Sequence, residues 1–170
     1  MNNTYFYQDK PIFGLDVGFS SLKVMQSDWQ GRKEVVTGYG VTSFDPRAIK
    51  DGVIVEPELI AKVMKELFNN NLIGEITTRR VTASIPASRT FNRTMTLPRL
   101  NKKDLEAALQ LEAEQYIPVP IDELYMDYNV ISETDKETEI LAVAAPKKII
   151  DSYHTLIRMA GLEAVALETS

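Results

Sequence analysis

The sequence has 170 residues, of which 44% are hydrophobic and 25% are charged, and these values are typical of a globular chain rather than a disordered one. The net charge of -5 argues against a nucleic-acid partner, because nucleic-acid-binding proteins usually carry a basic patch or stripe. The absence of cysteine excludes disulfides, thiolate catalysis and cysteine-ligated zinc, and it is compatible with a cytoplasmic location.

The N-terminal segment, residues 1–11 (MNNTYFYQDKP), has neither the basic region nor the apolar region of a signal peptide, and we expect a flexible tail. The longest wholly apolar run in the chain is ILAVAA, which is far shorter than the roughly 20 residues that span a bilayer. We therefore expect no direct membrane insertion, and any link to a membrane has to go through a partner.

The first part of the chain, residues 12–86, predicts a mixed sheet with one helix. PIFGLDVG is typical of a short buried strand, and SLKVMQSDWQGRKEVVTGYGVTSF predicts two strands around a turn at Gln30–Gly31, which makes a three-stranded meander. Gly38 and Gly40 interrupt the third strand and indicate either a bulge or a close packing contact. After the connector IKDGVIV, the segment EPELIAKVMKELFNNN has one apolar stripe and predicts a helix. RRVTASIP then predicts a strand that joins the sheet in parallel.

The second part begins with SRTFNRTMTLP, which alternates as a strand does. NKKDLEAALQLEAEQYI predicts a helix with Asn101 as its N-cap, and ELYMDYNVIS and TEILAVAAP predict two more strands. PKKIIDSYHTLIRMAG predicts a helix that ends at Gly161, and LEAVALETS begins a last strand. The expected fold class is α/β, with one unit formed by residues 12–86 plus 162–170. The second unit is an insertion over residues 87–161, which contains the strand-helix-strand-strand segment and the helix that follows it.

The stretch GLDVGFSSLK lies in the turn between the first two predicted strands, and its residue types suit a phosphate. Gly18 lets backbone approach a ligand closely, Ser20 and Ser21 offer hydroxyl and N–H groups, Lys23 supplies positive charge, and Asp16 is a ligand for hydrated magnesium. The stretch is neither a P-loop nor a dinucleotide-binding fingerprint, so an ordinary hairpin turn remains the alternative.

Other candidate residues have simpler explanations. His154 is the single histidine and falls at the edge of an apolar helical stripe, so packing explains it better than catalysis. The segment QYIPVPIDELYMDY, with prolines at 118 and 120, is either core packing at a helix-to-strand corner or a surface for a partner. No nucleophile with an adjacent general base is found, so we assign no catalytic residue.

Two of these stretches resemble known proteins. GLDVGFSSLKVMQ resembles the first phosphate motif of the actin-like ATPase superfamily, which includes actin, Hsp70, sugar kinases and the cell-division protein FtsA. The segment from SIPASRT to YNVI resembles the inserted subdomain of the PilM family of type IV pilus assembly proteins, and LEAEQYIPVPIDE is its most specific part. The resemblance implies an actin-like (ribonuclease H-like) subdomain 1A, formed by 12–86 plus 162–170, with the insertion as subdomain 1C.

For the nucleotide site, the resemblance implies that Asp16 lies near magnesium, held through water, and that Gly18, Ser20, Ser21 and Lys23 face the phosphates of ATP. Phe19 stands where many relatives have a small residue, and it either crowds the turn or packs away from the nucleotide. The family binds ATP between two domains, and the resemblance covers only the first of them. We therefore expect the second actin-like domain to be absent, ATP binding by this chain to be weak or absent, and no enzymatic activity.

The partner implied by the resemblance is the N-terminal cytoplasmic tail of the inner-membrane protein PilN. The tail would lie in a groove between subdomains 1A and 1C, where an extended peptide adds main-chain hydrogen bonds and places alternate apolar side chains in pockets. The expected role is that of a cytoplasmic adaptor, peripheral to the inner membrane and in contact with other platform proteins of the pilus. An FtsA-like division protein and an actin-like ATPase or sugar kinase are the alternatives.

Overall fold

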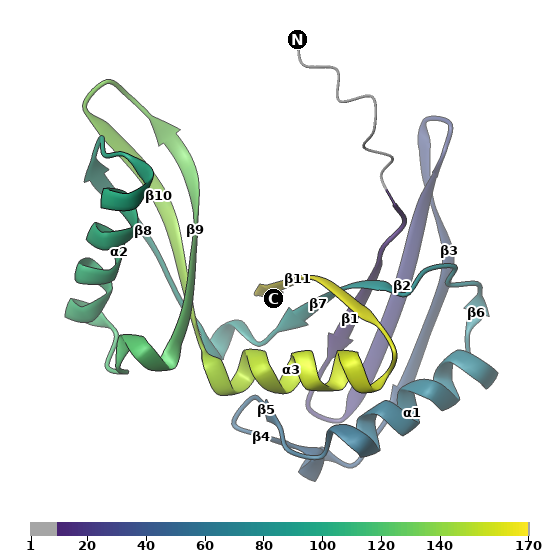
Figure 1. Ribbon diagram of the computed structural model, residues 1–170. Coiled ribbons are helices and arrows are strands. Elements are labelled where there is room, and N and C mark those ends of the chain that lie inside the picture. The colour runs from purple at the N-terminus through teal and green to yellow at the C-terminus, as the bar shows by residue number, and fades with distance from the viewer. Residues whose placement is uncertain (1–9, 170) are drawn as a thin grey trace.

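The computed structural model describes residues 10–169, so nearly all of the expected tail lies outside the described residues. Two sheets of different size make up the chain, and a small hairpin of β4 (Ile49–Lys50) and β5 (Val53–Ile54) stands where the sequence predicted a connector. Figure 1 shows the two sheets on opposite sides of the molecule, with helix α3 running between them.

The larger sheet has six strands in the order β11-β7-β1-β2-β3-β6. Strands β1, β2 and β3 form the predicted antiparallel meander, and β7 joins β1 in parallel, as the crossover helix predicted. The last strand, β11, returns to this sheet and runs parallel to β7. The bounds are β1 Phe13–Val17, β2 Ser21–Gln30, β3 Lys33–Ser43, β6 Ile73–Gly74, β7 Arg80–Ile85 and β11 Glu163–Thr169.

Gly38 in β3 meets both expectations for that strand. The register between β2 and β3 shifts next to it, between Gln26 and Ser27, which is the predicted bulge. A Cβ atom on Gly38 would lie 2.4 Å from the carbonyl oxygen of Glu75, so the backbone after β6 approaches this glycine closely. A larger residue does not fit here without a shift of the backbone.

Two helices cover one face of the larger sheet. Helix α1 (Pro57–Asn70) and helix α3 (Lys147–Met159) bury their apolar stripes in one core with Phe13 and Leu15 of β1. The sequence assigned α3 to the insertion, within 87–161, but Tyr153, Leu156 and Ile157 pack in the core of the larger unit. The physical reason is that a broad apolar stripe is buried best against the larger apolar surface, and α2 already covers the smaller sheet.

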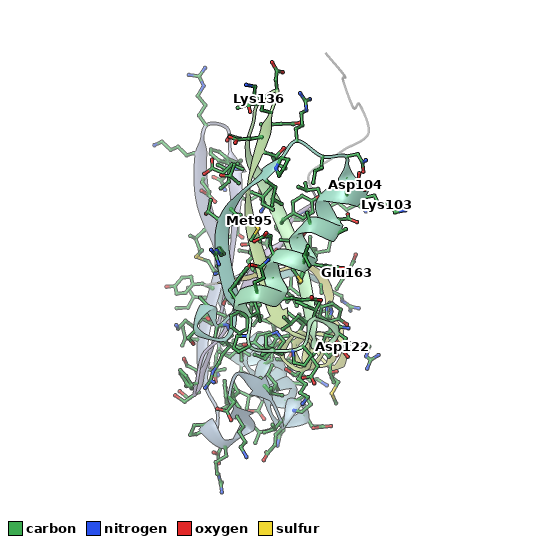
Figure 2. All side chains as sticks on the ribbon, turned by 90° about the vertical axis from the view of Figure 1, so that its left-hand side faces the viewer. Met95, Lys103, Asp104, Asp122, Lys136 and Glu163 are labelled. Carbon is green, nitrogen blue, oxygen red and sulfur yellow. The ribbon has the colours of Figure 1, made fainter. Side chains whose placement is uncertain are left out.

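The smaller unit has the predicted strand-helix-strand-strand order, and its antiparallel sheet has the strand order β8-β10-β9. Figure 2 views this unit from the side of α2, with Lys103 and Asp104 in the first turn of the helix and Lys136 at the tip of the β9–β10 hairpin. Asn101 caps α2 as predicted, since its side chain accepts a hydrogen bond from the Asp104 N–H at 3.1 Å. The bounds are β8 Phe91–Pro98, α2 Lys102–Tyr116, β9 Leu124–Glu133 and β10 Glu137–Pro146.

The proline-containing corner after α2 packs largely as core. Ile117 is buried, and Val119 and Ile121 are half-buried against the same small cluster, which also includes Leu124 and Ala144. Core packing therefore accounts for the apolar side chains around the two prolines, whereas Tyr125, near the end of the same segment, is 47% exposed.

Candidate functional site

The stretch that suits a phosphate forms the turn between β1 and β2. The N–H of Gly18 donates to the carbonyl oxygen of Ser21 at 2.9 Å, and the carbonyl oxygen of Ser20 accepts from the N–H of Phe44 at the same distance. The hydroxyl groups of Ser20 and Ser21 have no hydrogen-bond partner among residues 10–169. Phe19 is 78% exposed and also lines the small cavity beside Gly18, so its position relative to a nucleotide stays a prediction.

Asp16 is the centre of the polar contacts at this edge of the sheet. The ammonium group of Lys23 lies 2.9 Å from Asp16 Oδ2, and the Ser84 hydroxyl donates to Asp16 Oδ1 at 3.0 Å. The strand register explains both contacts, because Asp16 is paired with Lys23 on β2 and with Ser84 on β7. Ser84 was missed by the sequence analysis. The signal was the alternation in β7, where Thr82 and Ser84 are the polar positions between buried ones.

Tyr153 of α3 lies beneath the turn. Its hydroxyl group is 3.5 Å from the carbonyl oxygen of Val17, and the side chain is buried. Burial and, to a smaller extent, the charge of Asp16 raise the pKa of Tyr153 to about 12. A small cavity of about 170 Å³ separates this tyrosine from Gly18 and Arg89.

The donor set at the turn fits a phosphate with its metal ion. It offers one carboxylate, one ammonium group and the hydroxyls of Ser20, Ser21 and Ser84, which are groups that magnesium and phosphate oxygens use. The ammonium group of Lys23 has three N–H donors, and its contact with Asp16 uses one of them, which leaves donors for a phosphate. Both side chains are about half exposed. The five predicted residues are thus brought together, and their roles stay predictions.

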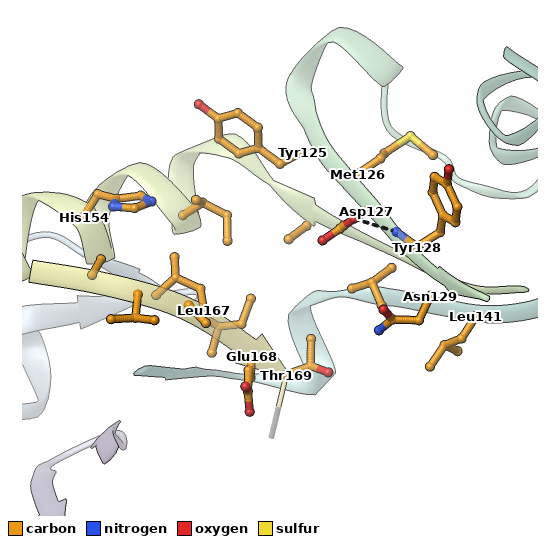
Figure 3. A pocket seen from close by; sticks show the side chains of 17 residues that line it. Tyr125, Met126, Asp127, Tyr128, Asn129, Leu141, His154, Leu167, Glu168 and Thr169 are labelled. Carbon is orange, nitrogen blue, oxygen red and sulfur yellow. Dashed lines mark hydrogen bonds between the residues drawn. The ribbon is translucent and has the colours of Figure 1, made fainter. Parts of the chain in front are cut away.

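A second site lies between the two sheets, and we call it the inter-sheet groove. It has a volume of about 680 Å³ and is lined by β9 and β10 of the smaller unit and by α3 and β11 of the larger one. Figure 3 shows the side chains that line it. They are Ile85, Tyr125, Met126, Asp127, Tyr128, Asn129, Leu141, Val143, Ala145, Ile150, His154, Ala164, Val165, Ala166, Leu167, Glu168 and Thr169.

The floor of the inter-sheet groove is apolar, and its polar groups stand on the walls. Leu141, Val143 and Ala145 come from the face of β10 that points away from α2. Asp127 accepts a hydrogen bond from the N–H of Tyr128 at 2.8 Å and is otherwise exposed to the groove (Figure 3). The Tyr125 hydroxyl donates to Asp151 Oδ1 at 3.2 Å, and this contact raises the pKa of Tyr125.

The sequence contained a signal for this groove that we did not use. In the run ILAVAA of β10, Ile140, Ala142 and Ala144 pack toward α2, while the alternate positions are apolar as well. A strand that is apolar on both faces has a second surface to cover. His154, expected at the edge of the stripe of α3, is exposed and stands on the groove wall.

Comparisons with known proteins identify this arrangement. A profile of the family described as "Type IV pilus assembly protein PilM" matches residues 14–169. Among solved structures, the PilM–PilN type IV pilus biogenesis complex is similar with a TM-score of 0.82 and 24% sequence identity, over 93% of this chain and 47% of that chain. The cytoplasmic domain of EpsL, an inner membrane component of the type II secretion system of Vibrio cholerae, is similar with a TM-score of 0.60 and 10% identity, over 94% of this chain and 57% of that chain.

These matches confirm the actin-like fold, and the chain spans about half the length of the solved chains that it resembles. No helix within residues 10–169 is long and apolar enough to cross a membrane. The matching profile is that of the PilM family and extends over both sheets, so it favours PilM over the FtsA-like alternative that the sequence left open. The chain belongs to the PilM family of type IV pilus assembly proteins.

Proposed function

We propose that the chain is a cytoplasmic adaptor of type IV pilus assembly that holds the N-terminal tail of the inner-membrane protein PilN in the inter-sheet groove. The groove carries the proposal, because it has a volume of about 680 Å³, lies beside the two strands β9 and β11, and presents the apolar side chains of β10 to an occupant. The similarity to a PilM structure in complex with PilN supports the choice of partner. The adaptor would lie at the inner face of the membrane through PilN and through other platform proteins.

The nucleotide has a modulating role in this proposal. ATP with magnesium binds at Asp16, Gly18, Ser20, Ser21 and Lys23 when a second actin-like domain closes over them. The turn between β1 and β2 supplies one side of such a site, and its donor set suits the phosphates. The chain itself acts as a scaffold, with weak nucleotide binding and no catalytic residue.

The test is a calorimetric titration of the chain with a synthetic peptide that copies the N-terminal tail of PilN from the same genome. We expect a dissociation constant near micromolar, equivalent to about -8 kcal/mol, that is the same with and without magnesium-ATP. Val143→Asp places a charge on the apolar floor and should weaken binding at least about tenfold. Val130→Asp is the matched control, because Val130 lies on β9 outside the groove and is 51% exposed.

Two outcomes would count against the adaptor. If the peptide gives no heat of binding while ATP alone gives a saturable signal, the turn is a functional nucleotide site, and this result favours the actin-like ATPase alternative over the adaptor. If Val143→Asp and Val130→Asp bind the peptide equally well, the tail binds elsewhere than in the inter-sheet groove.

A further inference from the structure

The larger sheet is covered by helices on one face only. Helices α1 and α3 pack on the face that carries Phe13 and Leu15, and no helix of the described chain covers the other face. We call this other face the open sheet face, and a hollow of about 700 Å³ lies over it. Its exposed apolar side chains are Met25, Val36, Tyr39 and Val41. Exposed apolar patches of this kind usually mark a surface that another segment or molecule covers.

The open sheet face has a polar end and an apolar end. The polar end holds Asp16, Lys23 and Ser84, which surround the predicted phosphate site. The other end, which we call the apolar zone, carries Met25, Trp29, Val36 and Tyr39. Trp29 belongs to this zone because it follows Met25 by four residues on β2, and alternate residues of a strand share a face.

The chain enters β1 on the side of the open sheet face. The guanidinium group of Arg80, on β7, donates from Nη1 to the carbonyl oxygen of Lys10 at 2.9 Å. Arg80 shares a face with Thr82, which lines the hollow, since Val81 between them is buried in the core. This contact holds the backbone at Lys10 on the open side of the sheet, and the segment that precedes it therefore starts there.

The nine residues before Lys10 include three consecutive aromatic residues, Tyr5, Phe6 and Tyr7. Segments that stay solvated are poor in aromatic residues, because they cannot bury enough apolar surface to offset the cost of ordering. Three residues of extended chain, from Lys10 to Tyr7, span about 10 Å, and two strand spacings of a sheet are also about 10 Å. The aromatic segment therefore reaches across β2 to β3.

The register of the strands places the apolar zone within this reach. Gly14 of β1 is paired with Met25 of β2, and continuing the same register places Lys10 level with Trp29. Figure 1 shows the β2–β3 hairpin extending past the start of β1, so the chain before β1 runs beside it. The point at which Arg80 holds the chain is thus level with the apolar zone.

We infer that residues 1–9 lie across the open sheet face and bury Tyr5, Phe6 and Tyr7 against the apolar zone. The segment leaves Asp16 and Lys23 uncovered, so it shares a face with the predicted phosphate site without overlapping it. The inference depends neither on the peptide partner nor on the nucleotide. It differs from the flexible tail that the sequence predicted for residues 1–11.

The fluorescence of Trp29 tests whether the aromatic segment covers the apolar zone, because Trp29 is the single tryptophan of the chain. A variant with Tyr5→Ser, Phe6→Ser and Tyr7→Ser should shift the emission of Trp29 to longer wavelengths and make acrylamide quench it faster. The matched control carries Asn2→Ser, Asn3→Ser and Gln8→Ser in the same segment and should behave as the wild type. Identical emission and quenching of the aromatic variant and the wild type would overturn the inference.

A disulfide trap tests which side of the β2–β3 hairpin the segment occupies, and the absence of natural cysteine makes it specific. Phe6→Cys is combined with Val36→Cys or, as the control, with Val35→Cys. These neighbours face opposite sides of the hairpin, and both are exposed. The Val36→Cys pair should oxidise severalfold faster, since a disulfide needs Cα atoms within about 7 Å. Equal rates would show that the segment does not select the open sheet face.

Light scattering and a dilution series separate the segment from a second copy of the chain as the cover. We expect a monomer whose Trp29 emission and disulfide yield are independent of protein concentration. Protection of Trp29 that is lost on dilution, together with disulfides between chains, would show that a second copy covers the apolar zone, and this result would overturn the inference.

Discussion

Asp16 and Lys23 lie directly opposite each other on β1 and β2, and their charged groups are 2.9 Å apart. The antiparallel register around the turn at Gly18 creates this pair. It places Asp16, two residues before the glycine, opposite Lys23, five residues after it. The contact holds the carboxylate and the ammonium group at the edge of the sheet, where the sequence predicts a phosphate site.

The first prediction concerns the stability contribution of this pair. The side chains of Lys23 and Asp16 are 55% and 44% exposed, so solvent screens their attraction. We expect Lys23→Gln to change the free energy of unfolding by less than about 1 kcal/mol, as measured by urea denaturation. If Lys23→Gln lowers the free energy of unfolding by more than about 2 kcal/mol, the ion pair stabilises the sheet itself, and a role in ligand binding is not needed to explain it.

Gly38 is predicted to be a position that accepts no side chain. A Cβ atom there would overlap the backbone of Glu75 at 2.4 Å, and backbone moves less readily than the end of a side chain. Gly38→Ala should lower the free energy of unfolding by about 2–3 kcal/mol, because the segment after β6 is pushed off β3. Gly14→Ala is the control, since its nearest contact would be an ordinary 3.8 Å. Similar stability of the two variants would contradict the close approach.

Tyr153 is predicted to make stability fall at high pH. Its pKa is about 12 in the folded chain and about 10 in an unfolded one, so the unfolded chain loses the phenol proton first. The contribution of Tyr153 is complete below pH 10 and is lost as the pH rises from about 10 to about 12. The difference in free energy of unfolding between the wild type and Tyr153→Phe should therefore shrink over this window. A constant difference from pH 8 to 12 would show that the hydroxyl group titrates normally.

The N-cap of α2 provides a local prediction. Asn101 accepts from the N–H of Asp104 and donates to the Asp104 carboxylate at 2.7 Å. Asn101→Ala should lower the free energy of unfolding by about 1 kcal/mol, since an orphan N–H of the first turn loses its acceptor. Lys103→Ala, at an exposed position in the same turn, should leave stability nearly unchanged when both are measured by thermal unfolding. An equal effect of the two substitutions would mean that the cap is not stabilising.

Much of the local structure was determined by the sequence alone. Alternation of apolar and polar residues identified the strands of the meander, and the apolar stripes and the Asn101 cap identified α1, α2 and α3. These signals depend on neighbours within one or two turns of chain, so they need no knowledge of the fold. The turn with Asp16, Gly18, Ser20, Ser21 and Lys23 could be found for the same reason, because one hairpin contains all five.

Only the tertiary structure decided which surfaces meet. Three features depend on segments that are far apart in the sequence. They are the packing of α3 in the core of the larger unit, the contact of Ser84 with Asp16, and the lining of the inter-sheet groove. An apolar stripe or a doubly apolar strand such as β10 shows that a surface is to be covered, but not by what. The packing of the whole chain determines which segment covers each apolar surface. In this packing β11 returns to the larger sheet as an edge strand and lies across the inter-sheet groove from β9.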